Sequence, residues 1–108
     1  MRGIKFRVWN TQMMEYLDEW GMDKIGWLQR ASNRGLGYTL MQYTGLKDKN
    51  GVEIYEGDLW QDDEGVIGQV KDSNYGWIVT DLDALYDCLA YGHVVGNVHE
   101  NPELLNEE

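Results

Sequence analysis

A thiol and two imidazoles lie close together near the end of the sequence: Cys88, His93 and His99. These groups are zinc ligands, and a thiol beside an imidazole can also act as a nucleophile and base. Zinc requires four ligands, or three and a water, and neither a CxxC nor an HxxxH spacing is present. We therefore predict no metal site, no disulfide and no catalytic thiol. We expect Cys88 to be a small buried residue.

Carboxylates form a second group that could do chemistry. Asp81, Asp83 and Asp87 have part of the spacing of a calcium-binding loop. However, Tyr86 stands at the sixth position, where such a loop has glycine, and Gly92 stands at the twelfth, where it has glutamate. We therefore predict no calcium site, and we place Asp83 and Asp87 on the solvated face of a helix.

Glu53, Glu56 and Asp58 surround Tyr55, and two of them could frame a hydrolytic pair. Acidic residues are also the ordinary occupants of exposed strand faces and turns. We expect a bend at Gly57-Asp58, with the Asp58 carboxylate accepting nearby backbone N–H bonds. The sequence thus predicts no catalytic, metal-binding or cofactor-binding residue, and we expect the protein not to be an enzyme.

Basic and aromatic side chains gather only in the first third of the chain: Lys5, Arg7, Trp9, Lys24 and Arg30. A face of this kind can stack bases and hold phosphates, so nucleic-acid binding is one hypothesis. The same face could instead dock onto an acidic face of another subunit.

The charge is divided unevenly along the 108 residues, whose net charge is −10. Residues 1–52 carry eight Lys/Arg against five Asp/Glu, a net of +3, whereas residues 53–108 carry only Lys71 against fourteen acidic groups, a net of −13. A strongly acidic half repels nucleic-acid phosphates. It could attract a basic partner or the basic half of a second copy, or the charge could serve solubility alone.

The elements that would position these groups are mostly short strands. Residues 4–9 alternate with period 2, with Ile4, Phe6 and Val8 on one face and Lys5, Arg7 and Trp9 on the other. Residues 13–17 could begin a helix, because Met13, Tyr16, Leu17 and Trp20 share a helical face, but the run is short, and a strand that forms a hairpin with residues 4–9 is preferred. Residues 24–29 are expected to be a further strand. The loop at 32–37 favours a boundary between an N-terminal β segment, 1–36, and a main domain, 37–108, which together form one compact unit.

Residues 40–58 carry the densest turn signals. Asn50-Gly51 is expected to supply the two positive-φ residues of a tight hairpin turn. Strands are expected at 66–70, 77–80 and 93–99, and a turn of helix at 102–105. One short helix is predicted near 82–91, because Leu82, Leu85, Tyr86 and Leu89 share a helical face. Residues 80–83 resemble a capping box, and Gly92 stands where a C′ glycine would end the helix.

Glycine-rich turns between short strands predict a mainly β fold, a small barrel or sandwich. The apolar fraction of 43% fits a globular chain. No apolar run reaches the roughly 20 residues of a membrane-spanning helix, and no signal peptide is evident, so a location in the cytoplasm is expected.

Three segments resemble the YopX family of small bacteriophage and prophage proteins: residues 2–9, residues 40–58 and residues 94–105, especially YTGLKD and IYEGD in the middle one. The resemblance implies an SH3-like β-barrel and a bacterial host cytoplasm. It implies no activity and brings no catalytic residues. The stretch between Asp58 and Tyr91 departs from the family's commoner pattern.

The leading hypothesis is therefore a non-enzymatic phage accessory protein that presents an acidic surface to a host or phage protein or to another copy of itself. The alternative is a nucleic-acid-binding protein that uses the basic N-terminal sheet and the barrel.

Overall fold

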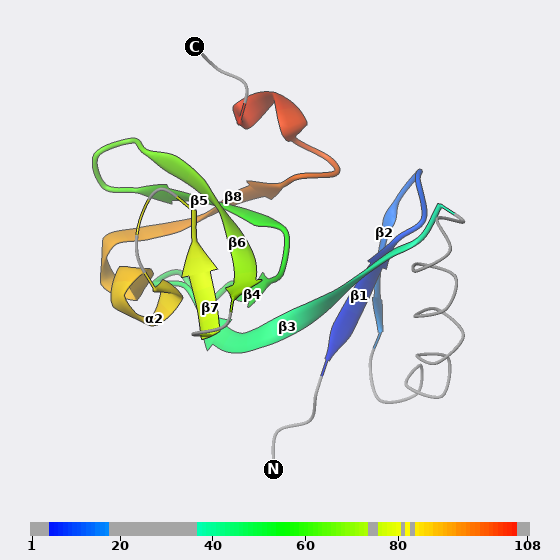
Figure 1. Ribbon diagram of the computed structural model, residues 1–108, viewed down its shortest axis with the longest axis horizontal. Coiled ribbons are helices and arrows are strands. Elements are labelled where there is room, and N and C mark those ends of the chain that lie inside the picture. Colours follow the sequence, from blue (N-terminus) through cyan, green and yellow to red (C-terminus); the bar gives the residue numbers. More distant parts are fainter. Residues whose placement is uncertain (1–4, 18–36, 74–75, 81, 83, 106–108) are drawn as a thin grey trace. The chain divides into compact units, whose positions relative to one another are not determined.

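A computed structural model describes residues 5–17, 37–73, 76–80, 82 and 84–105 (Figure 1). The chain forms two compact units, residues 1–43 and residues 44–108. Strand β3 (Thr39–Lys47) runs through both, pairing with β1 in the first unit and with β4 in the second. The predicted boundary between 36 and 37 borders residues outside the described ranges and stays a prediction.

The first unit contains the predicted N-terminal hairpin. β1 (Phe6–Trp9) pairs antiparallel with β2 (Met14–Leu17), and its other edge pairs antiparallel with β3. The connecting turn is held by Asn10, whose Oδ1 accepts the backbone N–H groups of Gln12 and Met13, each at 3.0 Å. The strand predicted at 24–29 lies outside the described residues.

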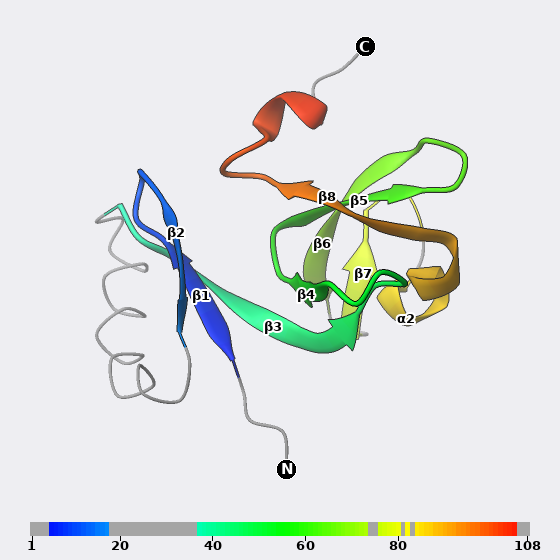
Figure 2. The ribbon, with the colours of Figure 1, turned by 180° about the vertical axis from the view of Figure 1, so that it is seen from behind.

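The second unit is a sheet with the strand order β7-β6-β5-β8, in which every pairing is antiparallel. The strands of this sheet are β5 (Asp58–Asp62), β6 (Ile67–Ser73), β7 (Gly76–Val79) and β8 (Gly92–Asn97). The unit also contains β4 (Glu53–Tyr55), which pairs with β3. Both views show this sheet curling (Figures 1 and 2). The mainly β prediction is confirmed, and the curl is consistent with the SH3-like barrel that the family resemblance implies.

The predicted short helix is present, but it begins later than its sequence suggests. α2 (Leu85–Cys88) continues into a 3-10 turn, η2 (Leu89–Tyr91). The capping-box prediction was wrong, because the N-cap is Ala84, which makes no side-chain hydrogen bond. The Thr80 hydroxyl instead accepts the Gln69 backbone N–H at 2.9 Å, which ties the end of β7 to β6. A second predicted turn, η3 (Pro102–Leu104), is confirmed.

The core of the second unit lies between the curled sheet and α2. Its buried members are Ile54, Trp60, Val70, Val79, Leu85 and Cys88. The prediction that Cys88 is buried is confirmed. Tyr86, predicted on the apolar face of the helix, is 74% exposed. Among the described residues, no helix has the length and apolar character needed to cross a membrane.

Gly92 has a different role from the one its position suggested. Its φ of 174° is extended, so it does not end the helix in a left-handed conformation but begins β8. A Cβ at this position would lie 2.5 Å from both the Gln61 carbonyl oxygen and the Trp60 Nε1 atom. Glycine is required here because the buried indole and the β5 backbone approach β8 too closely for a side chain.

We expect G92A to lower the free energy of unfolding by about 3 kcal/mol, the upper part of the range for overpacking. The matched control is G65A, where φ is 93° but no atom lies within 4 Å of the added Cβ. The free energy of unfolding of that variant should fall only by the cost of placing alanine in a left-handed backbone conformation, about 1 kcal/mol. Urea denaturation measures both, and equal losses would contradict the steric role of Gly92.

Candidate functional site

Two turns of the second unit repeat one five-residue pattern, Asp48–Val52 and Asp62–Val66. In each, the first residue's carboxylate Oδ1 accepts the backbone N–H groups of the third and fifth residues at 2.8–2.9 Å. The glycine at the fourth position has a positive φ, and its N–H donates to the aspartate carbonyl oxygen. The aspartate therefore builds the turn from its own side chain.

This geometry corrects the turn predicted at Asn50-Gly51. Gly51 has a φ of 85°, but Asn50 is not among the described residues with a positive φ. Only one residue with a positive φ is needed, because a type I turn followed by a glycine in the left-handed conformation also closes a hairpin.

The two turns are joined by an ion pair. Lys49 Nζ lies 3.2 Å from Asp63 Oδ1, and the two side chains are 45% and 55% exposed. At this exposure the pair contributes little to stability. It does place the 48–52 and 62–66 turns side by side.

Asp48 is nevertheless buried, and it holds a distant strand. Its Oδ2 accepts the Val94 backbone N–H at 3.0 Å, where the pairing of β8 with β5 shifts register around Val95. Burial on its own raises the pKa of Asp48. The N–H bonds from Val94, Val52 and Asn50, together with the field of His93, outweigh that effect and lower the pKa of this carboxyl below its usual 3.8.

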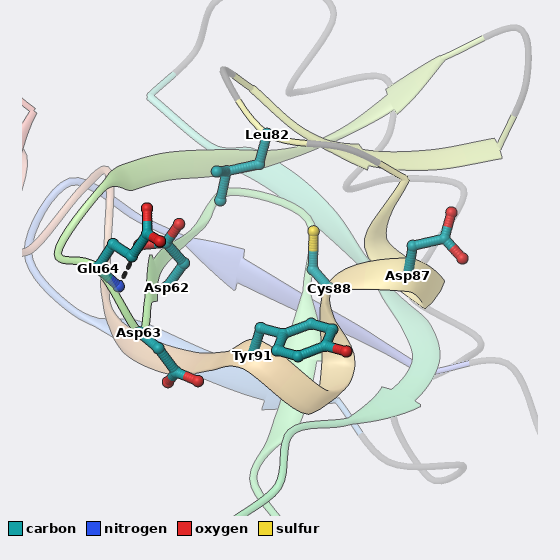
Figure 3. Close-up of a pocket in the computed structure, with 7 residues that line it drawn as sticks. All are labelled: Asp62, Asp63, Glu64, Leu82, Asp87, Cys88 and Tyr91. Atoms are coloured by element: carbon teal, nitrogen blue, oxygen red, sulfur yellow. Dashed lines mark hydrogen bonds between the residues drawn. The ribbon is translucent and has the colours of Figure 1, made fainter.

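A cavity of about 320 Å³ opens beside the second turn. It is lined by Asp62, Asp63, Glu64, Leu82, Asp87, Cys88 and Tyr91. The first three come from the β5–β6 turn, and the others come from the segment that contains α2 and η2 (Figure 3). The Cys88 sulfur points into the space between Leu82 and Tyr91 (Figure 3). The cavity thus has an apolar floor and a rim of carboxylates.

The cavity lining carries groups that could bind a cation. Neither histidine lines the cavity, so the Cys88 thiol has no imidazole base within the lining. A positively charged group with an apolar stem would match both the rim and the floor. Tyr91, 63% exposed, offers an aromatic face at the same site.

The structure does not bring Cys88, His93 and His99 together as a group that could bind a metal ion. His93 lies on β8, and the His99 backbone N–H donates to Asn97 Oδ1 in the turn after that strand. In the described ranges, no three His, Cys, Asp or Glu side chains form a group that could hold a metal ion. Of the calcium-loop candidates, Asp81 and Asp83 lie outside the described residues, and Asp87 is exposed beside the cavity.

Asp58 has the structural role that was predicted for it. The residue is buried, and its Oδ2 accepts the Tyr55 backbone N–H at 2.8 Å. This bond closes the bend at Gly57 and starts β5. The carboxylate is thereby committed to the backbone, which weighs against the hydrolytic pair with Glu53 or Glu56.

The basic and aromatic face of β1 differs from the prediction. Arg7 is only 2% exposed, its Nη1 donates to Tyr16 Oη at 3.5 Å, and its guanidinium lies 6.0 Å from that ring's centroid. Lys5 remains exposed and lies over the Tyr43 ring. Both faces of β1 are therefore covered near its middle. Lys24 and Arg30 fall outside the described residues.

Sequence reasoning placed Asp87 on a solvated helix face but did not bring it together with the 62–66 turn. The signal that was missed is Tyr91, an aromatic residue at the end of the helical segment. The cavity exists only because the curled sheet returns the chain from α2 to the β5–β6 turn.

The family model described as YopX protein matches residues 5–106. The chain belongs to the YopX family. A solved relative is protein EF1440 from Enterococcus faecalis, with 25% identity and a TM-score of 0.65, covering 97% of this chain and 99% of that one. YopX from Bacillus subtilis shares the fold at 19% identity and a TM-score of 0.51, covering 93% of this chain and 96% of that one. No curated protein matches. None of the matched names states an activity.

Within this YopX-family fold, we expect D48N to lower the free energy of unfolding by about 2–3 kcal/mol at pH 7, because an amide cannot replace a carboxylate that accepts bonds through both oxygens. D62N is the matched control: its oxygen can still accept both N–H groups of its own turn, so we expect a loss below about 1 kcal/mol.

The difference between wild type and D48N should also depend on pH. The folded pKa of Asp48 is lowered, so its contribution is complete above the usual value of 3.8 and is lost as the pH falls through the folded value. Urea denaturation at pH 7, 5, 4 and 3 measures it. If the difference in unfolding free energy between wild type and D48N grew below pH 4, the lowered pKa of Asp48 would be contradicted.

Proposed function

We propose that this protein is a phage- or prophage-encoded accessory protein of the bacterial cytoplasm that has no catalytic activity and binds a basic partner protein. The binding surface is the acidic second unit, centred on the cavity beside the 62–66 turn. The observation that carries this proposal is the cavity lining, which combines four acidic residues with Leu82, Cys88 and Tyr91.

Two further features support a protein partner. Tyr86 and Tyr91 are both largely exposed on the helical segment, and exposed tyrosines are enriched in the cores of protein–protein interfaces. The net charge of −13 over residues 53–108 would speed encounter with a basic protein and select against acidic ones. The same charge opposes nucleic-acid phosphates, and the burial of Arg7 removes a central member of the only basic face that the sequence offered.

We expect the immobilised wild-type protein to capture a specific basic protein from phage-infected bacteria, and increasing salt to release it. The variant D63N/E64Q/D87N neutralises the exposed rim and should lose most of that capture. D72N/E100Q/E103Q removes the same charge from exposed positions outside the cavity and should retain it. Mass spectrometry identifies what is bound.

Equal capture by the two triple variants would refute a role for the cavity surface. Recovery of nothing above a blank resin would refute the interaction itself. Light scattering of the wild type provides a further arm: if the protein binds only another copy of itself, the proposal of a separate partner is wrong.

A further inference from the structure

Resting on the proposed function, we infer that the cavity receives an arginine side chain of the partner protein, and that Lys49 is an internal competitor at its rim. The cavity would then be a subsite for one side chain rather than a general acidic patch. Lys49 would set how tightly that side chain binds.

The shape and lining of the cavity favour a guanidinium. A volume of about 320 Å³ exceeds that of a small ion and suits a long side chain. Leu82 and the Cys88 sulfur provide apolar contact for an aliphatic stem (Figure 3). The exposed Tyr91 ring offers a face on which a planar guanidinium can stack. The compact ammonium group of lysine is not planar and stacks less well on an aromatic ring.

The rim carboxylates differ in what they already hold. Asp62 Oδ1 accepts two backbone N–H bonds within its turn, and Asp63 Oδ1 pairs with Lys49. Within the described part of the chain, Glu64 and Asp87 form no ion pair. Glu64 lies on the turn side of the cavity and Asp87 on the helix side (Figure 3). The Asp87 carboxylate points away from the space between Leu82 and Tyr91 (Figure 3), so Glu64 is the carboxylate assigned to the incoming guanidinium.

Lys49 shows that this rim attracts a cation. Its ammonium reaches Asp63 from the neighbouring 48–52 turn, at 3.2 Å, through side chains that are about half exposed. A pair of that exposure is weak, so an arriving cation can displace it. Removing the lysine charge would release Asp63 and make the rim more negative. Binding of a cationic side chain should then become tighter.

The test uses the full chain and a defined probe, the peptide acetyl-Gly-Arg-Gly-amide, titrated while amide NMR signals are recorded. We expect shifts at residues 62–66 and 85–91. The matched peptide with citrulline has nearly the same shape but no charge and should cause none. The matched lysine peptide should bind at least about three-fold more weakly, because it lacks the stacking contact.

Variants separate the roles of the lining residues. E64Q should weaken binding of the arginine peptide about ten-fold, whereas D72N should leave it unchanged. K49Q should tighten it about three-fold, since a competitor is lost. Y91F should bind like wild type, and Y91A should bind about five-fold more weakly, as expected for loss of the ring alone.

Several results would overturn the inference. Equal binding of the arginine and citrulline peptides would exclude a charge-selective site, and equal binding of the lysine peptide would exclude the preference for arginine. Unchanged affinity in K49Q would exclude the competitor role. If the arginine peptide fails to bind while D63N/E64Q/D87N still loses the captured partner, the inference fails and the proposed function stands. If the peptide binds but no partner is captured, the proposed function fails.

Discussion

The buried carboxylate of Asp48 is the interaction on which the second unit depends. One of its oxygens shapes the turn between β3 and β4, and the other accepts the N–H of Val94, which is 46 residues away in the sequence. That second bond falls where β8 shifts register against β5. A strand that bulges must find another acceptor for a displaced N–H, and a charged acceptor gives the strongest bond available. The turn and the closing strand are therefore fixed by one side chain.

The same turn chemistry is used twice, with different consequences. At residues 48–52 the aspartate is buried, and its second oxygen reaches β8. At residues 62–66 the equivalent aspartate lines the cavity, and its carboxylate holds its own turn. A local motif thus gives both a structural anchor and a rigid edge for a binding surface. The ion pair between Lys49 and Asp63 connects the two copies.

Period-2 alternation and glycine turns were enough to predict several of the strands, because each depends on neighbouring residues. They were not enough for contacts between distant segments. The side chain of Arg7 was placed on a solvent-facing strand surface, but Tyr16 from the paired strand contacts it. Gly92 fitted a helix end by position, whereas its actual constraint comes from Trp60 on β5. The helix starts at Leu85 and not at the capping box because Thr80 bonds to β6.

The cavity was beyond prediction for the same reason, since its two sides meet only through the curl of the sheet. What the sequence does convey is an excess of carboxylates, and the structure divides them into two kinds. The carboxylates of Asp48, Asp58 and Asp62 accept backbone N–H bonds and hold turns of the second unit. Glu64 and Asp87 hold no turn or strand in the described part of the chain. Uncommitted charges of one sign repel each other and weaken the folded state. Because their effect on folding is unfavourable, the requirements of the fold do not explain their presence in the cavity lining, whereas the binding of a cation, as proposed above, would explain it.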